Sequence, residues 1–186
     1  MNEKIIRIIK SKSKRKLVCL TAYSKPISKI VDKHCDIILV GDSVATAFYG
    51  MKDTRSIKID TMINHAKSVR QNSKRSLLVF DMPNNTYRNI REAKTNAKKI
   101  IKSVKFDAIK IESNGRNYNL IKNLVKSGFQ VMGHIGYTPQ FKKKFKVQGS
   151  KKQEEKKLIE DAKMIENAGA FSIVLECITK KVAKSI

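Results

Sequence analysis

Four acidic residues follow or close short apolar segments of a strongly basic chain, which has 16 Asp plus Glu against 40 Lys plus Arg. They are Asp42 in IILVGDS, Asp81 in LLVFDMP, Glu112 in AIKIES and Glu176 in SIVLEC. Short apolar runs bounded by turn residues are typical of buried strands in a parallel sheet. Carboxylates at the carboxyl ends of such strands gather where β/α enzymes build their active sites, and they repel one another unless a proton or a hard cation lies among them. The pattern therefore predicts an active site that uses a metal ion.

The composition indicates one globular, cytoplasmic domain. The 186 residues are 41% hydrophobic, and no apolar stretch approaches the ~20 residues that span a bilayer. The N-terminus lacks the apolar core and small-residue cleavage site of a signal peptide. The three cysteines form no CxxC pair, so we expect reduced thiols.

The formal net charge of +24 raises the alternative of a nucleic-acid-binding protein. Most of this charge is Lys spread along the chain, and the aromatic residues that would stack on bases are few, at 6%. We therefore predict no specific nucleic-acid site and interpret the densest run, KKKFK at 142–146, as a solvated loop or an anion-facing rim.

The elements that must position the carboxylates alternate along the chain. Apolar runs predict strands at 17–23, 36–40, 76–80, 108–111, 130–134 and 171–176. Helical periodicity predicts helices at 26–34, 60–71, 89–104, 118–127 and 152–167 and from 180 onward, while 44–58 is expected to be irregular.

This alternation predicts a parallel sheet, either doubly wound or a barrel. A doubly wound nucleotide-binding fold carries a glycine-rich turn after its first strand, but here that strand ends in TAYSKP. We therefore predict a (β/α)₈ TIM barrel. About six of its eight β/α units are visible, so we expect a single domain over 1–186, truncated after the sixth strand.

The strand ends, taken in order, resemble a known family. LTAYSKPISKI, ILVGDSVATAFYG, VFDMP, AIKIES, VMGHIGYTPQ, KVQG and AGAFSIVLEC together are similar to ketopantoate (3-methyl-2-oxobutanoate) hydroxymethyltransferases. The resemblance implies a (β/α)₈ barrel in a homo-oligomer, a decamer in the family. It also implies transfer of a hydroxymethyl group from 5,10-methylenetetrahydrofolate to 3-methyl-2-oxobutanoate through an enolate stabilised by Mg²⁺. The product would be 2-dehydropantoate, in the first step of pantothenate and coenzyme A precursor synthesis.

The resemblance also implies roles for individual residues. Those near the magnesium would be Asp42, Asp81 and Glu112. Those that contact the substrate would be Asp42, Ser43, Asp81, Lys110 and His134. Glu176 would be the general base, a carboxylate kept away from the metal to remove the C3 proton that the polarised ketone makes acidic.

Each residue alone has a plainer interpretation. Asp42 could cap a helix, Lys110 and Glu112 could form an exposed ion pair on one face of a strand, and His134 could be a hydrogen-bonded core histidine. Two other classes of protein also stay open. One is a Mg²⁺-dependent barrel lyase or aldolase acting on another 2-oxo acid, and the other is the basic nucleic-acid-binding protein.

Overall fold

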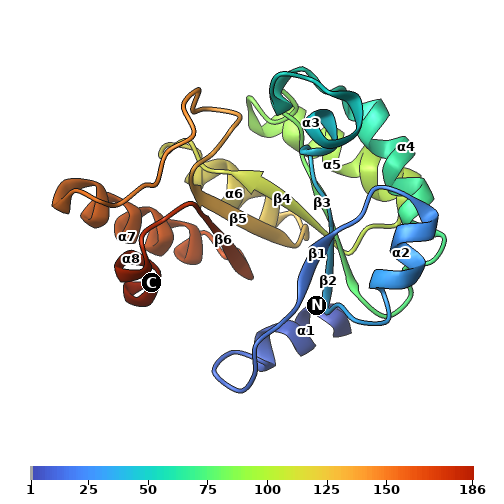
Figure 1. Cartoon of the computed structure of the whole chain (residues 1–186), viewed down its shortest axis with the longest axis horizontal. Coiled ribbons are helices and arrows are strands. Elements are labelled where there is room, and N and C mark those ends of the chain that lie inside the picture. Colours follow the sequence, from blue (N-terminus) through green and yellow to red (C-terminus); the bar gives the residue numbers. More distant parts are fainter. Residues whose placement is uncertain (1) are drawn as a thin grey trace. The chain divides into compact units, whose positions relative to one another are not determined.

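The computed structural model describes residues 2–186, in which helices and strands alternate (Figure 1). In chain order the elements are α1 (Glu3–Lys10), β1 (Cys19–Thr21), α2 (Lys25–Val31), β2 (Ile37–Val40), α3 (Val44–Tyr49), the 3₁₀ helix η1 (Thr54–Ser56), α4 (Ile59–Arg70), β3 (Leu77–Asp81), α5 (Ile90–Val104), β4 (Ala108–Glu112), α6 (Tyr118–Lys126), β5 (Val131–Gly136), α7 (Lys152–Asn167), β6 (Ser172–Glu176) and α8 (Lys180–Ser185). The chain divides into two compact units, Met1–Ile109 and Lys110–Ile186.

The strands are parallel and follow one another in the sheet in chain order. In the first unit Val40 of β2 lies opposite Phe80 of β3, and in the second unit Gly136 of β5 lies opposite Glu176 of β6. A doubly wound sheet would reverse its strand order at a switch point, whereas a barrel keeps the order of the chain. The order observed is that of the predicted barrel class, with six strands present.

The central strands form the core. Every residue of β3, β4 and β5 is buried, whereas the three residues of β1 are exposed and those of β6 are half-buried. Asp81 ends β3 and Glu112 ends β4, so each of these carboxylates lies at the end of a buried strand. Among residues 2–186 no helix is long and apolar enough to cross a membrane.

Strand and helix boundaries agree with the sequence-based predictions to within a few residues, with two exceptions. The stretch 44–58, predicted to be irregular, contains α3 and η1. Helix α3 ends at Gly50, whose left-handed φ of 60° stops it. Helix α1 was not predicted, although its apolar positions Ile5 and Ile8 have helical spacing and are buried.

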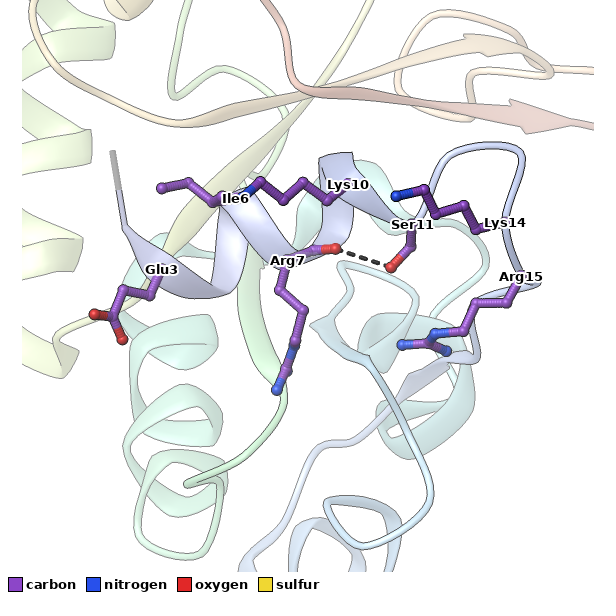
Figure 2. Close-up of a pocket in the computed structure, with 7 residues that line it drawn as sticks. All are labelled: Glu3, Ile6, Arg7, Lys10, Ser11, Lys14 and Arg15. Atoms are coloured by element: carbon purple, nitrogen blue, oxygen red, sulfur yellow. Dashed lines mark hydrogen bonds between the residues drawn. The ribbon is translucent and has the colours of Figure 1, made fainter.

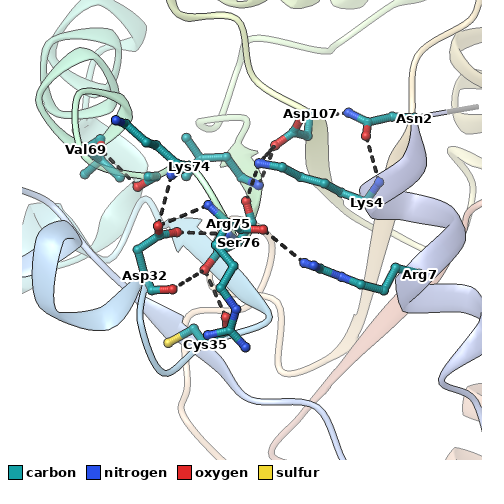
Figure 3. A network of polar contacts seen from close by, with 12 residues as sticks. Asn2, Lys4, Arg7, Asp32, Cys35, Val69, Lys74, Arg75, Ser76 and Asp107 are labelled. Atoms are coloured by element: carbon teal, nitrogen blue, oxygen red, sulfur yellow. Dashed lines mark hydrogen bonds and ion pairs between the residues drawn. The ribbon is translucent and has the colours of Figure 1, made fainter.

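A polar network fixes the turn that leads into β3 (Figure 3). One carboxylate oxygen of Asp32 accepts the backbone N–H groups of Lys74 at 3.0 Å and Arg75 at 3.1 Å, and the other accepts that of Ser76 at 2.8 Å. Burial alone would raise the pKa of Asp32, but these backbone donors hold it below its usual range. The start of β3 is thereby set, and with it the position of Asp81 at its end.

Basic side chains in and just after helix α1 contact the rest of the first unit. A shallow cavity of about 450 Å³ runs along it, with Arg7, Lys10, Lys14 and Arg15 among its lining residues (Figure 2). Two of these side chains serve the fold, because Arg7 donates to the carbonyl of Arg75 and Arg15 to the carboxylate of Asp36. The hydrogen bond from Arg15 lowers the pKa of Asp36 to about 2. Arg7 thus anchors α1 to the turn before β3, and Arg15 anchors the segment between α1 and β1.

Candidate active site

In the first unit, Asp42 and Asp81 lie next to each other. Because Val40 of β2 is opposite Phe80 of β3, the residues that follow meet at the same end of the two strands. The backbone N–H of Asp42 donates to Oδ2 of Asp81 at 3.2 Å. Both residues are buried, with only 3% and 2% of their surface exposed. The structure therefore brings Asp42 and Asp81 together, and their role as metal ligands stays a prediction.

Ser43 joins this pair at the start of helix α3. It occupies the N-cap position, yet its side chain makes no capping hydrogen bond. Its Oγ instead lies 2.6 Å from the hydroxyl of Tyr23, which follows β1. Tyr23 was not among the site residues predicted from the sequence. The feature that could have indicated it is a polar aromatic residue just after the first strand, in TAYS.

In the second unit, Lys110 and Glu112 are buried members of β4, with 4% and 0% of their surface exposed. Residues two apart on a strand point to the same face, so the two side chains share one side of β4. The alternative of an exposed surface ion pair is therefore wrong. The backbone N–H of Gln140 donates to Oε2 of Glu112 at 3.1 Å. Gln140 is the last residue of the TPQ motif at 138–140, whose contacts the sequence alone did not predict.

His134 lies between two carboxylates of the same unit. Its Nδ1 is 3.6 Å from Oε1 of Glu112, and its Nε2 is 3.3 Å from Oε2 of Glu176. The imidazole is fully buried, whereas 39% of the Glu176 side chain is exposed. The structure thus links three of the predicted site residues, and it places His134 against both carboxylates rather than in an apolar core.

The donor chemistry of the first group suits magnesium. Mg²⁺ is commonly held by one or two carboxylates and keeps waters or substrate oxygens as its other ligands, and Asp42 with Asp81 supplies such a pair. Within residues 2–186 no group of three or more His, Cys, Asp or Glu residues is arranged to hold a metal ion. Glu112 belongs to the other unit, and its place near the metal stays a prediction.

Gly136 allows Glu176 its position at the end of β6. Gly136 has a φ of 97°, and a Cβ atom built on it would lie 2.1 Å from the carbonyl oxygen of Glu176. We expect Gly136→Ala to displace the backbone that carries Glu176 and to lower the free energy of unfolding by about 2–4 kcal/mol, from overpacking and left-handed strain together. Denaturant unfolding monitored by circular dichroism measures this change.

Gly128 is the matched control for Gly136. Its φ is 89°, but a Cβ atom there meets nothing within 4 Å. Gly128→Ala therefore reports the cost of the left-handed backbone alone, about 1–2 kcal/mol. Equal losses in the two variants would show that Gly136 does not matter for the position of Glu176.

Comparisons with known proteins cover nearly the whole chain. A family model described as ketopantoate hydroxymethyltransferase matches residues 3–186. A 3-methyl-2-oxobutanoate hydroxymethyltransferase from Pelagibacter ubique (strain HTCC1062) is 50% identical over 186 residues, which are 100% of this chain and 72% of that protein. A protein of the same name from Clostridium botulinum (strain Alaska E43 / Type E3) is 44% identical over 92% of this chain and 64% of its own length. The chain thus spans 64% to 72% of these relatives.

Solved structures agree on the fold. A phosphonopyruvate hydrolase is similar with a TM-score of 0.73 at 13% identity, over 95% of this chain and 64% of that one. A 2,3-dimethylmalate lyase, described as a PEP mutase/isocitrate lyase superfamily member, has a TM-score of 0.69 at 12% identity, over 97% of this chain and 64% of that one. At such identities the likeness concerns the fold alone, and it confirms the predicted β/α-barrel class.

The family match bears on the classes that the sequence left open. The Pelagibacter ubique hydroxymethyltransferase is 50% identical to this chain over all 186 residues, which supports the hydroxymethyltransferase hypothesis. The match also covers the four segments that carry the carboxylates, from Asp42 to Glu176. The chain belongs to the ketopantoate hydroxymethyltransferase family.

Proposed function

We propose that this protein transfers a hydroxymethyl group from 5,10-methylenetetrahydrofolate to 3-methyl-2-oxobutanoate, giving 2-dehydropantoate for pantothenate synthesis. The names of its relatives support this reaction. The observation that carries the proposal is a difference in burial among the carboxylates. Asp42 and Asp81 are buried side by side, whereas the Glu176 side chain is 39% exposed at a strand end. Such a division suits one group of carboxylates that holds a cation and another that takes a proton.

In the proposed site Asp42 and Asp81 hold Mg²⁺, which supplies Lewis-acid polarisation of the substrate ketone when it is bound. Ser43 donates its hydroxyl hydrogen to the substrate carboxylate, and the ammonium group of Lys110 balances the substrate's negative charge. Because Lys110 is buried on β4, its charge acts in surroundings where water screens it little.

Glu176 removes the C3 proton of the substrate. Its exposed carboxylate is free to approach the substrate, and the adjacent imidazole of His134 restricts its orientation. The electron pair left on C3 forms the new C–C bond to the one-carbon unit. Both C–N bonds of the folate's methylene carbon break, and water supplies the hydroxyl oxygen. The proton taken from C3 and one proton of the water end on the two nitrogens of the tetrahydrofolate that leaves. We further propose that the protein works as a homo-oligomer, as the resemblance to its family implies.

Product analysis tests this proposal. The protein is incubated with Mg²⁺, 5,10-methylenetetrahydrofolate and, in turn, 3-methyl-2-oxobutanoate, 2-oxobutanoate and pyruvate. We expect mass spectrometry to find 2-dehydropantoate as the main product, and only when folate is present. Cleavage of 2,3-dimethylmalate in the absence of folate, without any hydroxymethyl product, would instead support the barrel lyase.

A further inference from the structure

Two hydroxyl groups in the first unit form a close pair, and the proposed reaction uses only one of them, that of Ser43. The hydroxyl oxygen of Tyr23 lies 2.6 Å from Oγ of Ser43, and the two residues are 20 positions apart in the chain. Ser43 is directly preceded by Asp42, and it is the residue expected to contact the substrate carboxylate. A hydrogen bond between the Tyr23 hydroxyl and Ser43 therefore restricts the direction in which the Ser43 hydroxyl points.

The backbone around this pair leaves room for it. A serine at the N-cap usually bonds a backbone N–H of the first helical turn, but Ser43 does not. Gly41 lies close to the pair. A Cβ atom built on it would lie 2.9 Å from Ser43 Oγ and 3.6 Å from the Tyr23 hydroxyl oxygen. A side chain at position 41 would therefore crowd Ser43 Oγ, while it would only reach ordinary contact with the Tyr23 hydroxyl.

Tyr23 is itself held in place from two directions. Nδ1 of His65 lies 2.7 Å from the backbone carbonyl oxygen of Tyr23, and since a carbonyl only accepts, this nitrogen donates. Nε2 of His65 lies 2.8 Å from the hydroxyl of Tyr49. The ring of Phe48 packs edge-on against that of Tyr23, with centroids 5.4 Å apart. The Tyr23 hydroxyl is therefore presented to Ser43 from a fixed ring.

We propose that Tyr23 is a positioning residue for 2-oxo acid binding, which it controls through Ser43; this rests on the proposed function. A carboxylate only accepts hydrogen bonds, so Ser43 must donate its one proton to the substrate. The Tyr23 hydroxyl must then donate to Ser43 Oγ. The result is a chain from Tyr23 through Ser43 to the carboxylate, in which each hydrogen bond strengthens the next. Without the Tyr23 hydroxyl, the Ser43 hydroxyl is free to rotate away.

A double-mutant cycle tests this coupling. Isothermal titration measures the dissociation constant of 3-methyl-2-oxobutanoate, with Mg²⁺ present, for the unchanged protein, Tyr23→Phe, Ser43→Ala and the double variant. We expect Tyr23→Phe to weaken binding by about 5- to 10-fold in the unchanged background, the loss of one hydrogen bond. In the Ser43→Ala background it should change binding less than about twofold, because the tyrosine acts only through the serine.

Two further variants keep the test decisive. Tyr118→Phe removes a tyrosine hydroxyl outside this cluster, which donates to Asp161, and it should leave the dissociation constant unchanged. Gly41→Ala keeps both hydroxyls but crowds Ser43 Oγ, and it should weaken substrate binding as Tyr23→Phe does. This variant tests the pair even if Tyr23→Phe fails to fold.

The outcomes separate this inference from the proposed function. Tyr23→Phe should raise KM but leave the saturated rate of C3 proton exchange within about twofold, since the role inferred for Tyr23 is in binding and not in proton removal. An equal loss from Tyr23→Phe in both backgrounds, or no loss in either, would overturn the role of Tyr23 while the unchanged protein still catalyses C3 exchange. Absence of exchange and of substrate binding in the unchanged protein would overturn both.

Discussion

Glu176→Gln should slow exchange of the C3 proton of 3-methyl-2-oxobutanoate with solvent deuterium by at least about 100-fold. Glutamine keeps the shape of the side chain and its ability to hydrogen-bond, but it cannot take up the proton. The exchange requires no folate, so the measurement isolates proton removal from the later transfer. Proton NMR in D₂O follows the loss of the C3 signal directly.

Glu166→Gln provides the matched control. Glu166 is an exposed residue of α7 in the same unit, so its substitution makes the same change of charge away from the strand ends. We expect its exchange rate to stay within about twofold of that of the unchanged protein. Undiminished exchange in Glu176→Gln would assign the base to another residue, and His134, 3.3 Å from Glu176, would be the next to test.

Asp42→Ala should weaken Mg²⁺ binding by at least about tenfold, since it removes one of the two carboxylates that fit the ion. Asp42 is the better target of the pair. The carboxylate of Asp81 also accepts the backbone N–H of Asp42, so its loss would disturb the turn as well as the metal. Isothermal titration of Mg²⁺ in the presence of 3-methyl-2-oxobutanoate measures the affinity without depending on turnover.

Asp60→Ala is the control for this substitution. Asp60 belongs to α4 of the same unit, with 72% of its side chain exposed and an ion pair to Lys99. Its loss changes the net charge equally, so a general electrostatic effect of the strongly basic surface would appear in both variants. The same Mg²⁺ affinity in Asp42→Ala and Asp60→Ala would refute the metal assignment.

The sequence predicted the strand ends well because their signal is local. A run such as LLVFD is short, apolar and followed by Met-Pro, and in the structure β3 covers these five residues. The same holds for Ser172–Glu176, where the carboxylate closes the strand. Such runs fix where a carboxylate lies along the chain, and parallel pairing then brings the ends of neighbouring strands together.

The helix after β2 was missed because its local signals are weak. Val44–Tyr49 contains β-branched Val44 and Thr46, which are poor helix formers, and the serine at its N-cap does not cap it. That serine is instead bonded to Tyr23. The helix therefore begins without the capping hydrogen bond that a serine at this position usually makes.

The contacts within the site could not be derived from spacing. His134 touches Glu112 and Glu176, which are 22 residues before it and 42 after it in the sequence, and only the pairing of the strands brings such residues together. Tyr23 likewise meets Ser43 only after β1 and β2 have paired. The sequence therefore predicted candidate site residues, and the structure added which of them contact one another.

Transfer of a labelled carbon tests the central claim most directly. The protein is supplied with Mg²⁺, 3-methyl-2-oxobutanoate and 5,10-methylenetetrahydrofolate that carries ¹³C in its methylene group. We predict that ¹³C NMR will find the label in the hydroxymethyl group of 2-dehydropantoate, and that formation of this product will fall with Glu176→Gln and with Asp42→Ala. Exchange of the C3 proton without any labelled product, or no reaction of 3-methyl-2-oxobutanoate at all, would contradict the proposed hydroxymethyl transfer.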